Sequence, residues 1–270
     1  MPVFGAQGAA ELQGALISDT LRKVSTIEPL ASLYVFFAGG SLPTGPRAGM
    51  RRIPAFGGDI PWSAGAFQPS VTVLRQRGRD LGERLEGAFR FLLRRHPAAV
   101  VIGTDSPLLS GRLLRIALGE LRVCDAVLGP CPDGGYYLVG LRPGRPRRSS
   151  AVLRAPQIQA SRFPAFESAP AGGNLSRESL FTSIRWSTPY AFRDTLRNLL
   201  AADCSCSLLQ TVRDLDRPQD VTRLHKELAR SQAARRLAPN TWRFLKAASR
   251  RRIARGLKSS SGGGRSMLRI

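Results

Sequence analysis

Long apolar runs, histidines and paired cysteines are all scarce in this chain of 270 residues. No run of about 18 apolar residues occurs, so we expect no membrane-spanning helix. The first residues lack a charged segment followed by an apolar one, so we also expect no secretory signal. The four cysteines include no C-x-x-C pair, and the two histidines are His96 and His225. These absences argue against a zinc site, a redox motif and a serine–histidine triad, and predict a cytoplasmic protein with reduced thiols.

Acidic residues are also few, at 19 against 41 Lys and Arg, which gives a net charge of +22. The excess is concentrated in two segments. Residues 142–178 contain 7 Arg and 2 Glu, and residues 222–270 contain 14 Lys or Arg and 1 Glu, which leaves 20 basic and 16 acidic residues elsewhere. A basic tail of this kind can bind nucleic acid or another acidic surface, and it can equally be a solvated run of charge.

Apolar periodicity predicts an alternation of strands and helices. We expect helices over residues 7–24, 80–95, 110–121, 188–202 and 218–230, and strands over 32–38, 71–74, 99–103, 125–129, 135–141 and 207–212. This order predicts an α/β domain over residues 1–230, a doubly wound and mostly parallel sheet with helices on both faces. Residues 39–70 are predicted to form a long loop, 143–177 a disordered insert, and 231–270 a basic tail that is disordered or partly helical.

The most informative single residue is Asp105, which follows the apolar run of residues 99–103. A short β-branched run of this type is typical of a strand covered on both faces. Ligands of open α/β sheets bind at the carboxyl ends of the strands, so Asp105 is placed where a metal–phosphate group would lie. The alternative is that Asp105 caps the following helix, because Asp favours such positions.

Two further acidic motifs fall at strand ends or tight turns. Asp133 precedes two glycines, a sequence that is either a common turn or a loop whose glycines let backbone approach a ligand. Asp214 and Asp216 follow the last predicted strand. Mg²⁺ and Mn²⁺ commonly use one or two carboxylates together with substrate phosphates, so several carboxylates on one sheet edge predict a divalent metal site.

The run QRGRDLGERL at residues 76–85 opens a predicted helix. The N–H groups of its first turn can hold an anion, and Arg84 can add a charge-assisted contact to phosphate. The alternative is an ordinary capped helix with charged surface residues.

Five motifs in this order resemble a known family. They are QRGRDLGERL (76–85), GTDSPLL (103–109), DAVLGPCPDGGYYLVGL (125–141), LFTSIRWST (180–188) and DLDRPQDV (214–221). The chain resembles the bacterial glycosyltransferase-like family associated with arsenosugar biosynthesis. That family belongs to the nucleotide-diphospho-sugar transferase superfamily with a GT-A fold and is related to molybdenum-cofactor and phospho-lactate guanylyltransferases. The resemblance covers about residues 7–40 and 71–230.

The resemblance implies transfer from a nucleotide-sugar donor to a small-molecule acceptor with Mg²⁺ or Mn²⁺. Asp105 and Asp133 would be catalytic, and Asp105 and Asp216 would hold the metal, although Asp214 or Asp216 could instead stabilise the turn. The residues implied to lie near donor or acceptor are Asp80, Gly82, Arg84, Gly103, Thr104, Gly134, Gly135, Trp186, Ser187 and Thr188. Two alternatives are a nucleotidyltransferase of the guanylyltransferase type and a non-catalytic protein that binds nucleic acid through its basic tail.

The start of the sequence departs from the family pattern. Family members begin with a strand and a basic loop that grips the nucleotide, whereas this sequence begins Met1-Pro2-Val3-Phe4-Gly5. We therefore expect the central strand and the nucleotide clamp to be missing from this sequence. Either the protein starts further upstream, or the chain binds nucleotide poorly.

Overall fold

The structure is a computed structural model and describes residues 4–27, 30–38, 71–143, 153–154 and 180–260. The predicted loop over residues 39–70 lies outside the described residues. So does the predicted insert over residues 143–177, except for residue 143 and Leu153–Arg154. The elements in chain order are α1 (Gly5–Ser25), β1 (Leu33–Phe37), β2 (Val71–Arg75), α2 (Leu81–Leu93), β3 (Ala99–Ile102), α3 (Gly111–Glu120), β4 (Ala126–Pro130), β5 (Tyr136–Leu141), β6 (Leu153–Arg154), α4 (Ala191–Ala201), β7 (Cys206–Leu208), α5 (Pro218–Arg230), α6 (Gln232–Leu237) and α7 (Pro239–Ser260).

The strands form a five-stranded sheet in the order β3-β5-β4-β7-β6 and a separate parallel pair, β1 and β2. In the larger sheet β5 is antiparallel to both β3 and β4, whereas β7 is parallel to both β4 and β6. When the β1–β2 pair is included, three of the five strand pairings are parallel. In the larger sheet β3, β4 and β7 all run in the same direction. Within the described part of the chain, no pairing joins the two sheets.

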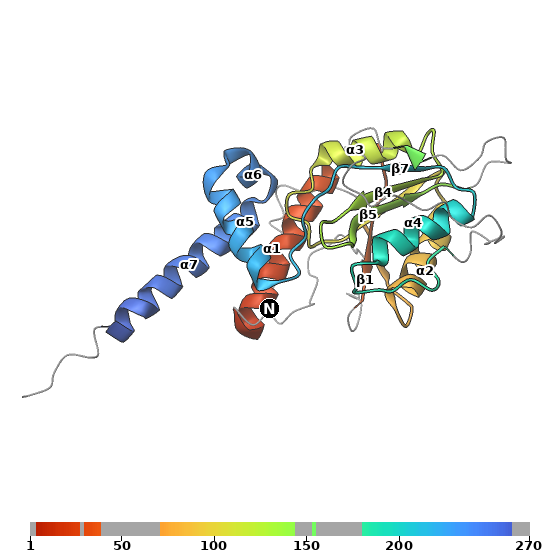
Figure 1. The fold of residues 1–270 in the computed structure, drawn as a ribbon. Helices are drawn as coiled ribbons and strands as arrows, with labels where there is room; N and C mark the ends of the chain where they lie inside the picture. Colours follow the sequence, from red (N-terminus) through yellow and green to blue (C-terminus); the bar gives the residue numbers. More distant parts are fainter. Residues whose placement is uncertain (1–3, 28–29, 39–70, 144–152, 155–179, 261–270) are drawn as a thin grey trace, which may run out of the picture.

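Helices cover both faces of the larger sheet, which confirms the predicted α/β architecture (Figure 1). On one face, α3 packs through Leu113 and Ala117 against alternate residues of β4 and β5, including Val127 and Leu138. On the other face, α2 and α4 pack against the intervening residues, such as Leu128. The strands β4 and β5 therefore bury both faces, which explains the continuous apolar runs in their sequences.

The C-terminal region is helical and packs against the N-terminal helix. α1 lies beside α5, α6 and α7 in a second group of helices (Figure 1). Leu12 and Leu16 of α1 share an apolar cluster with Ala234, Leu245 and residues of α5. Residues 232–260 of the expected tail are helical, which is the partly helical alternative, and Ala234, Ala238 and Leu245 recur at helical spacing and are buried.

Three other elements differ from the sequence prediction. β7 ends at Leu208, whereas the strand was predicted to continue to residue 212. β6, at Leu153–Arg154, pairs with β7 inside the predicted insert, so these two residues are a correction to the disordered segment. Helix α4 begins at Ala191 rather than 188, because the Thr188 hydroxyl donates to the Arg185 carbonyl in a preceding turn. Among the described helices, none is long and apolar enough to cross a membrane.

Candidate functional site

The carboxyl ends of β3, β4 and β7 lie at one edge of the larger sheet, because the three strands run in the same direction. The residues that follow these strands include Asp105 after β3, Asp133 after β4, and Asp214 and Asp216 after β7. The edge therefore gathers four aspartates from segments that are far apart in the sequence, as the sequence analysis predicted. We call these four residues the acidic edge.

Long-range backbone hydrogen bonds fix the segment that carries Asp214 and Asp216. The Val212 N–H donates to the Pro130 carbonyl at 3.2 Å, which ties this segment to the end of β4. The Leu215 N–H donates to the Asp105 carbonyl at 3.0 Å, which ties it to the turn after β3. The segment thus continues past the end of β7 at Leu208 as extended chain and brings its aspartates to the other two strand ends.

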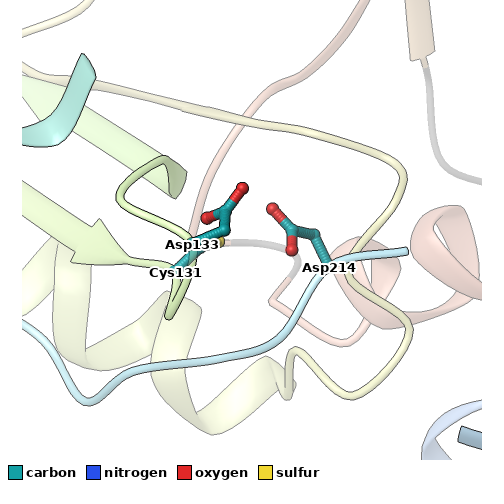
Figure 2. Close-up of side chains that lie close together, drawn as sticks. All are labelled: Cys131, Asp133 and Asp214. Carbon is teal, nitrogen blue, oxygen red and sulfur yellow. The ribbon is translucent and has the colours of Figure 1, made fainter. Parts of the chain in front are cut away.

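Asp133, Asp214 and Cys131 form the tightest group at this edge. One ligand atom from each side chain lies within 4.8 Å of the others. Figure 2 shows the carboxylates of Asp133 and Asp214 pointing toward one another from the β4–β5 turn and the segment after β7. The sequence analysis left Asp214 and Asp216 as alternatives and named Asp216 as the metal ligand, whereas this group contains Asp214.

The carboxylates disfavour one another's charge. Burial raises the pKa of Asp105, and the nearby charges of Asp216 and Asp133 raise it further. Burial also raises the pKa of Asp214 and of Asp216, each with additional repulsion from neighbouring aspartates. A divalent cation would relieve this repulsion, and the carboxylate oxygens are the donors that Mg²⁺ and Mn²⁺ prefer, so the residues fit the implied metal.

Cys131 is a site residue that the sequence analysis did not identify. Its side chain is buried, and burial together with the neighbouring Asp214 carboxylate raises the pKa of the thiol far above its ordinary value. The thiol is therefore protonated and donates a hydrogen bond to Asp214. The only sequence signal was its position two residues before Asp133 at the end of a strand.

The turn after β3 is supported from below by helix α1. A Cβ atom on Gly103 would lie 2.5 Å from Asp105 Oδ1, so the glycine leaves the space that this carboxylate occupies. Gln13 Nε2 donates to Thr104 Oγ1 at 3.0 Å. Lys23 Nζ donates to the Pro107 carbonyl at 2.9 Å, and burial lowers the pKa of this lysine to about 8. Helix α1 therefore holds the turn that carries Asp105 at two points, Thr104 and Pro107.

The capping alternative for Asp105 is wrong. Helix α3 begins at Gly111, and Ser110 caps it by accepting from the Leu113 N–H at 3.2 Å. Asp105 lies outside this helix and is available for the acidic edge.

The Asp133-Gly134-Gly135 turn connects the acidic edge to the segment before α4 that contains Trp186, Ser187 and Thr188. Asp133 Oδ1 accepts from the Gly135 N–H at 3.0 Å. Gly134 has a φ of +92°, and a Cβ atom there would lie 2.1 Å from the Pro189 carbonyl oxygen. The Phe192 N–H donates to the Gly134 carbonyl at 2.9 Å. The turn is therefore locked against the residues that precede and open α4.

The start of α2 contacts the same segment from another side. Asp80 caps the helix by accepting from the Glu83 N–H at 2.9 Å, and Arg84 donates to the Gly78 carbonyl at 3.1 Å. A Cβ atom on Gly82 would lie 2.5 Å from the Phe181 carbonyl oxygen and 3.1 Å from Trp186 Nε1. Asp80 and Arg84 thus have local structural partners, as expected for the alternative of an ordinary capped helix. Gly82 allows α2 to approach Trp186 closely.

Trp186 and Thr188 complete the set of predicted residues. The Trp186 ring packs edge-on against Tyr136 of β5, with ring centroids 6.3 Å apart. The Thr188 hydroxyl closes the turn before α4. The predicted residues therefore fall into an acidic group and an α2–Trp186 group, joined through the turn at Gly134.

A cavity of about 380 Å³ lies at the opposite edge of the sheet, beside the start of β4 and the end of β5. Its lining includes Phe89, Arg90, Asp125, Leu141 and Phe181. None of the predicted site residues lines it, and its two carboxylates, Glu86 and Asp125, are paired with Arg90 and Arg142. We therefore place the candidate site at the acidic edge.

Comparisons with known proteins support this fold. A family model described as "Uncharacterized protein conserved in bacteria (DUF2064)" matches residues 47–158, a segment that includes Asp105 and Asp133. A crystal structure from Desulfovibrio desulfuricans G20, named a "putative nucleotide-diphospho-sugar transferase", is similar with a TM-score of 0.62 and 23% identity, over 90% of this chain and 84% of that one. No curated protein matches the chain significantly. The similarity to the solved structure is one of fold.

Proposed function

We propose that this protein is a transferase that takes a nucleotide-activated sugar as donor and depends on a divalent metal. The observation that carries the proposal is the convergence of Asp105, Asp133 and Asp214 at the carboxyl edge of β3, β4 and β7. The neighbour's name and the motif resemblance point to the same substrate class. Among nucleotide-sugar enzymes, the resemblance favours the glycosyltransferase-like family associated with arsenosugar biosynthesis.

In this proposal Asp105, Asp214 and Asp216 would hold Mg²⁺ or Mn²⁺, and the metal would supply positive charge to offset the charge that develops on the leaving diphosphate. Asp133 is exposed at the rim of the edge and faces the donor sugar or the acceptor. The backbone of Gly135 can approach the donor closely, because glycine carries no side chain, whereas Gly134 packs against Pro189. Trp186 and Tyr136 offer an aromatic wall beside this turn.

Replacing one carboxylate tests the proposal. We expect Asp105→Asn to weaken Mn²⁺-dependent binding of UDP-glucose or GDP-mannose by at least about tenfold, because a metal ligand is lost while the shape of the side chain is kept. Isothermal titration calorimetry with and without Mn²⁺ measures this. Glu86→Gln on α2 is the control, because Glu86 is paired with Arg90 away from the acidic edge. Donor and metal binding that is equal in both variants would refute the assignment.

A nucleotidyltransferase is the competing reaction class on the same fold. Release of a nucleoside diphosphate from a nucleotide sugar supports the glycosyltransferase, whereas release of pyrophosphate from a nucleoside triphosphate with a phosphorylated acceptor supports the nucleotidyltransferase. The two products separate on an anion-exchange column.

A further inference from the structure

The C-terminal helices carry a concentration of positive charge that the transferase site does not use. Residues 218–250 contain eight Lys or Arg and two acidic residues, Asp220 and Glu227. No acidic residue occurs after Glu227. Figure 1 shows α7 extending away from the sheet, with its second half beyond the other helices. The charge therefore lies on the C-terminal helices, away from the larger sheet.

The basic side chains are exposed in rows along two helices. On α7 the exposed residues Arg243, Lys246 and Arg250 recur at intervals of three and four, which places them on one side of the helix. On α5 the residues Arg223, Lys226 and Arg230 recur in the same way and are also exposed. We call the three residues on α7 the basic helix surface.

Few negative charges oppose this surface. Arg223 is paired with Asp220 at 3.0 Å, and Glu227 lies on α5 between Lys226 and Arg230. Arg243 donates to the Asn240 side chain at 3.0 Å. Within the described part of the chain, no ion pair involves Arg243, Lys246 or Arg250. The row on α7 thus keeps its full charge for a partner.

The apolar side chains of α7 are already used in packing. Trp242 stacks on His225 with ring centroids 5.6 Å apart, and Phe244 packs edge-on against Phe4 at 5.2 Å. Leu245 is 3% exposed. Binding to a lipid surface needs an apolar face that enters the bilayer, and single-stranded nucleic acid is usually gripped by exposed aromatic rings. Over residues 239–250 the helix offers neither, and presents charge alone.

We propose that the basic helix surface binds the phosphate backbone of duplex nucleic acid without sequence preference. Regularly spaced Lys and Arg on a straight, exposed helix match a rigid polymer with repeated negative charge. Each phosphate contact releases a bound counterion, so the affinity depends steeply on salt. The proposal does not depend on the transferase activity, because the basic helix surface shares no residue with the acidic edge.

The test uses the full chain and a fluorescein-labelled 20-base-pair DNA duplex of mixed sequence, with fluorescence anisotropy read from 50 to 200 mM KCl. We expect the triple variant Arg243→Gln, Lys246→Gln, Arg250→Gln to bind roughly tenfold or more weakly at 50 mM salt. The slope of log affinity against log salt should become shallower by about 2 to 3, since three phosphate contacts are lost.

A matched variant controls for net charge. Arg94→Gln, Arg112→Gln, Arg122→Gln removes the same charge from exposed positions on the sheet region, and it should bind within about twofold of the unchanged protein. Equal weakening in both triple variants would overturn the proposal, because net charge alone would then account for binding. Binding to phosphatidylglycerol vesicles that depends on Arg243, Lys246 and Arg250, while duplex binding does not, would overturn it in favour of a lipid surface.

Discussion

At the scale of single residues, the mutual repulsion of the aspartates at the acidic edge lowers the stability of the metal-free protein. Asp105, Asp214 and Asp216 each have a raised pKa, through burial first and mutual repulsion second. A carboxyl whose folded pKa lies above its unfolded value binds more protons in the folded state. Its contribution to the free energy of unfolding therefore falls as pH rises through that window.

This repulsion makes a prediction for the protein without metal. Asp214→Asn should raise the free energy of unfolding by about 0.5–1 kcal/mol at pH 7.5, because one charge of the repelling group is removed. The same variant should lose most of the stabilisation that Mn²⁺ gives the unchanged protein. Thermal unfolding with and without Mn²⁺ measures both effects.

The pH dependence supplies an internal check on this prediction. The Mn²⁺-induced rise in melting temperature should be smaller at pH 5 than at pH 7.5, since protonated carboxyls bind the metal poorly. A variant that melts lower than the unchanged protein, or keeps its full Mn²⁺ shift, would contradict the role given to Asp214.

The sequence placed Asp105 and Asp133 at the carboxyl ends of strands because each comes shortly after a recognisable strand. It could not separate Asp214 from Asp216, because both lie on the same short segment after β7. Their placement depends on bonds from Val212 and Leu215 to strands far away in the chain. Cys131 escaped notice for a related reason, since its hydrogen bond to Asp214 joins two segments that only the fold brings together.

At the scale of elements, the β4–β5 turn and the start of α4 act as one unit. Gly134 supplies the positive φ, and the Pro189 carbonyl fills the space where a side chain would lie. The Asp194 carboxylate is fully buried and accepts from Arg185 at 2.8 and 2.9 Å, which holds the turn before α4 in place. The position of Asp133 is therefore set by packing against another element.

Gly134→Ala should disrupt this unit. We expect a loss of about 2 kcal/mol or more in the free energy of unfolding, from the positive φ and from the contact with Pro189. Urea denaturation followed by circular dichroism measures the loss, and the affinity for the nucleotide-sugar donor should fall because Asp133 is displaced.

Gly119→Ala is the matched control for Gly134→Ala. Gly119 lies within α3 with no neighbouring atom within 4 Å of the added Cβ, so alanine there should stabilise the helix by up to about 1 kcal/mol. Equal stability changes at the two glycines would show that the turn tolerates a side chain.

Element boundaries were predicted well where the sequence contains a clear start or stop signal, such as a proline or a regular apolar period. Pro218 opens α5 where it was expected, and the periodic α2 and α3 lie within two residues of their predicted ends. The start of α4 was predicted three residues too early, because Thr188 belongs to a turn that precedes the helix. The two-residue β6 could not be predicted, because its pairing with β7 comes from the sheet and not from its own sequence.

At the scale of the whole molecule, α1 connects the acidic edge with the C-terminal helices. Asp19 is fully buried and accepts four hydrogen bonds from Asn240 and Thr241 at the start of α7, at 2.8–3.1 Å. Four residues later, Lys23 donates to the turn after β3. One helix thus carries both contacts.

Asp19→Ala should loosen α7. Removing this carboxylate leaves the N–H groups and hydroxyl of the helix start without their acceptor, so we expect a loss of roughly 3 kcal/mol or more and faster tryptic cleavage within α7. Mass spectrometry of the fragments locates the cleavage.

Glu11→Ala is the comparison for this variant, because Glu11 is exposed on the same helix and its side chain accepts a hydrogen bond from Gln7, one turn away. It should leave the cleavage rate unchanged. Cleavage of α7 at the same rate in both variants would show that Asp19 does not anchor it.

The Asp19–Thr241 contact joins residues 222 positions apart. During synthesis, the N-terminal helix emerges from the ribosome long before its anchor exists. The contact between α1 and the start of α7 can therefore form only after nearly all of the polypeptide has been made, and a nascent chain halted before residue 241 would hold the acidic edge beside a helix α1 that lacks this contact.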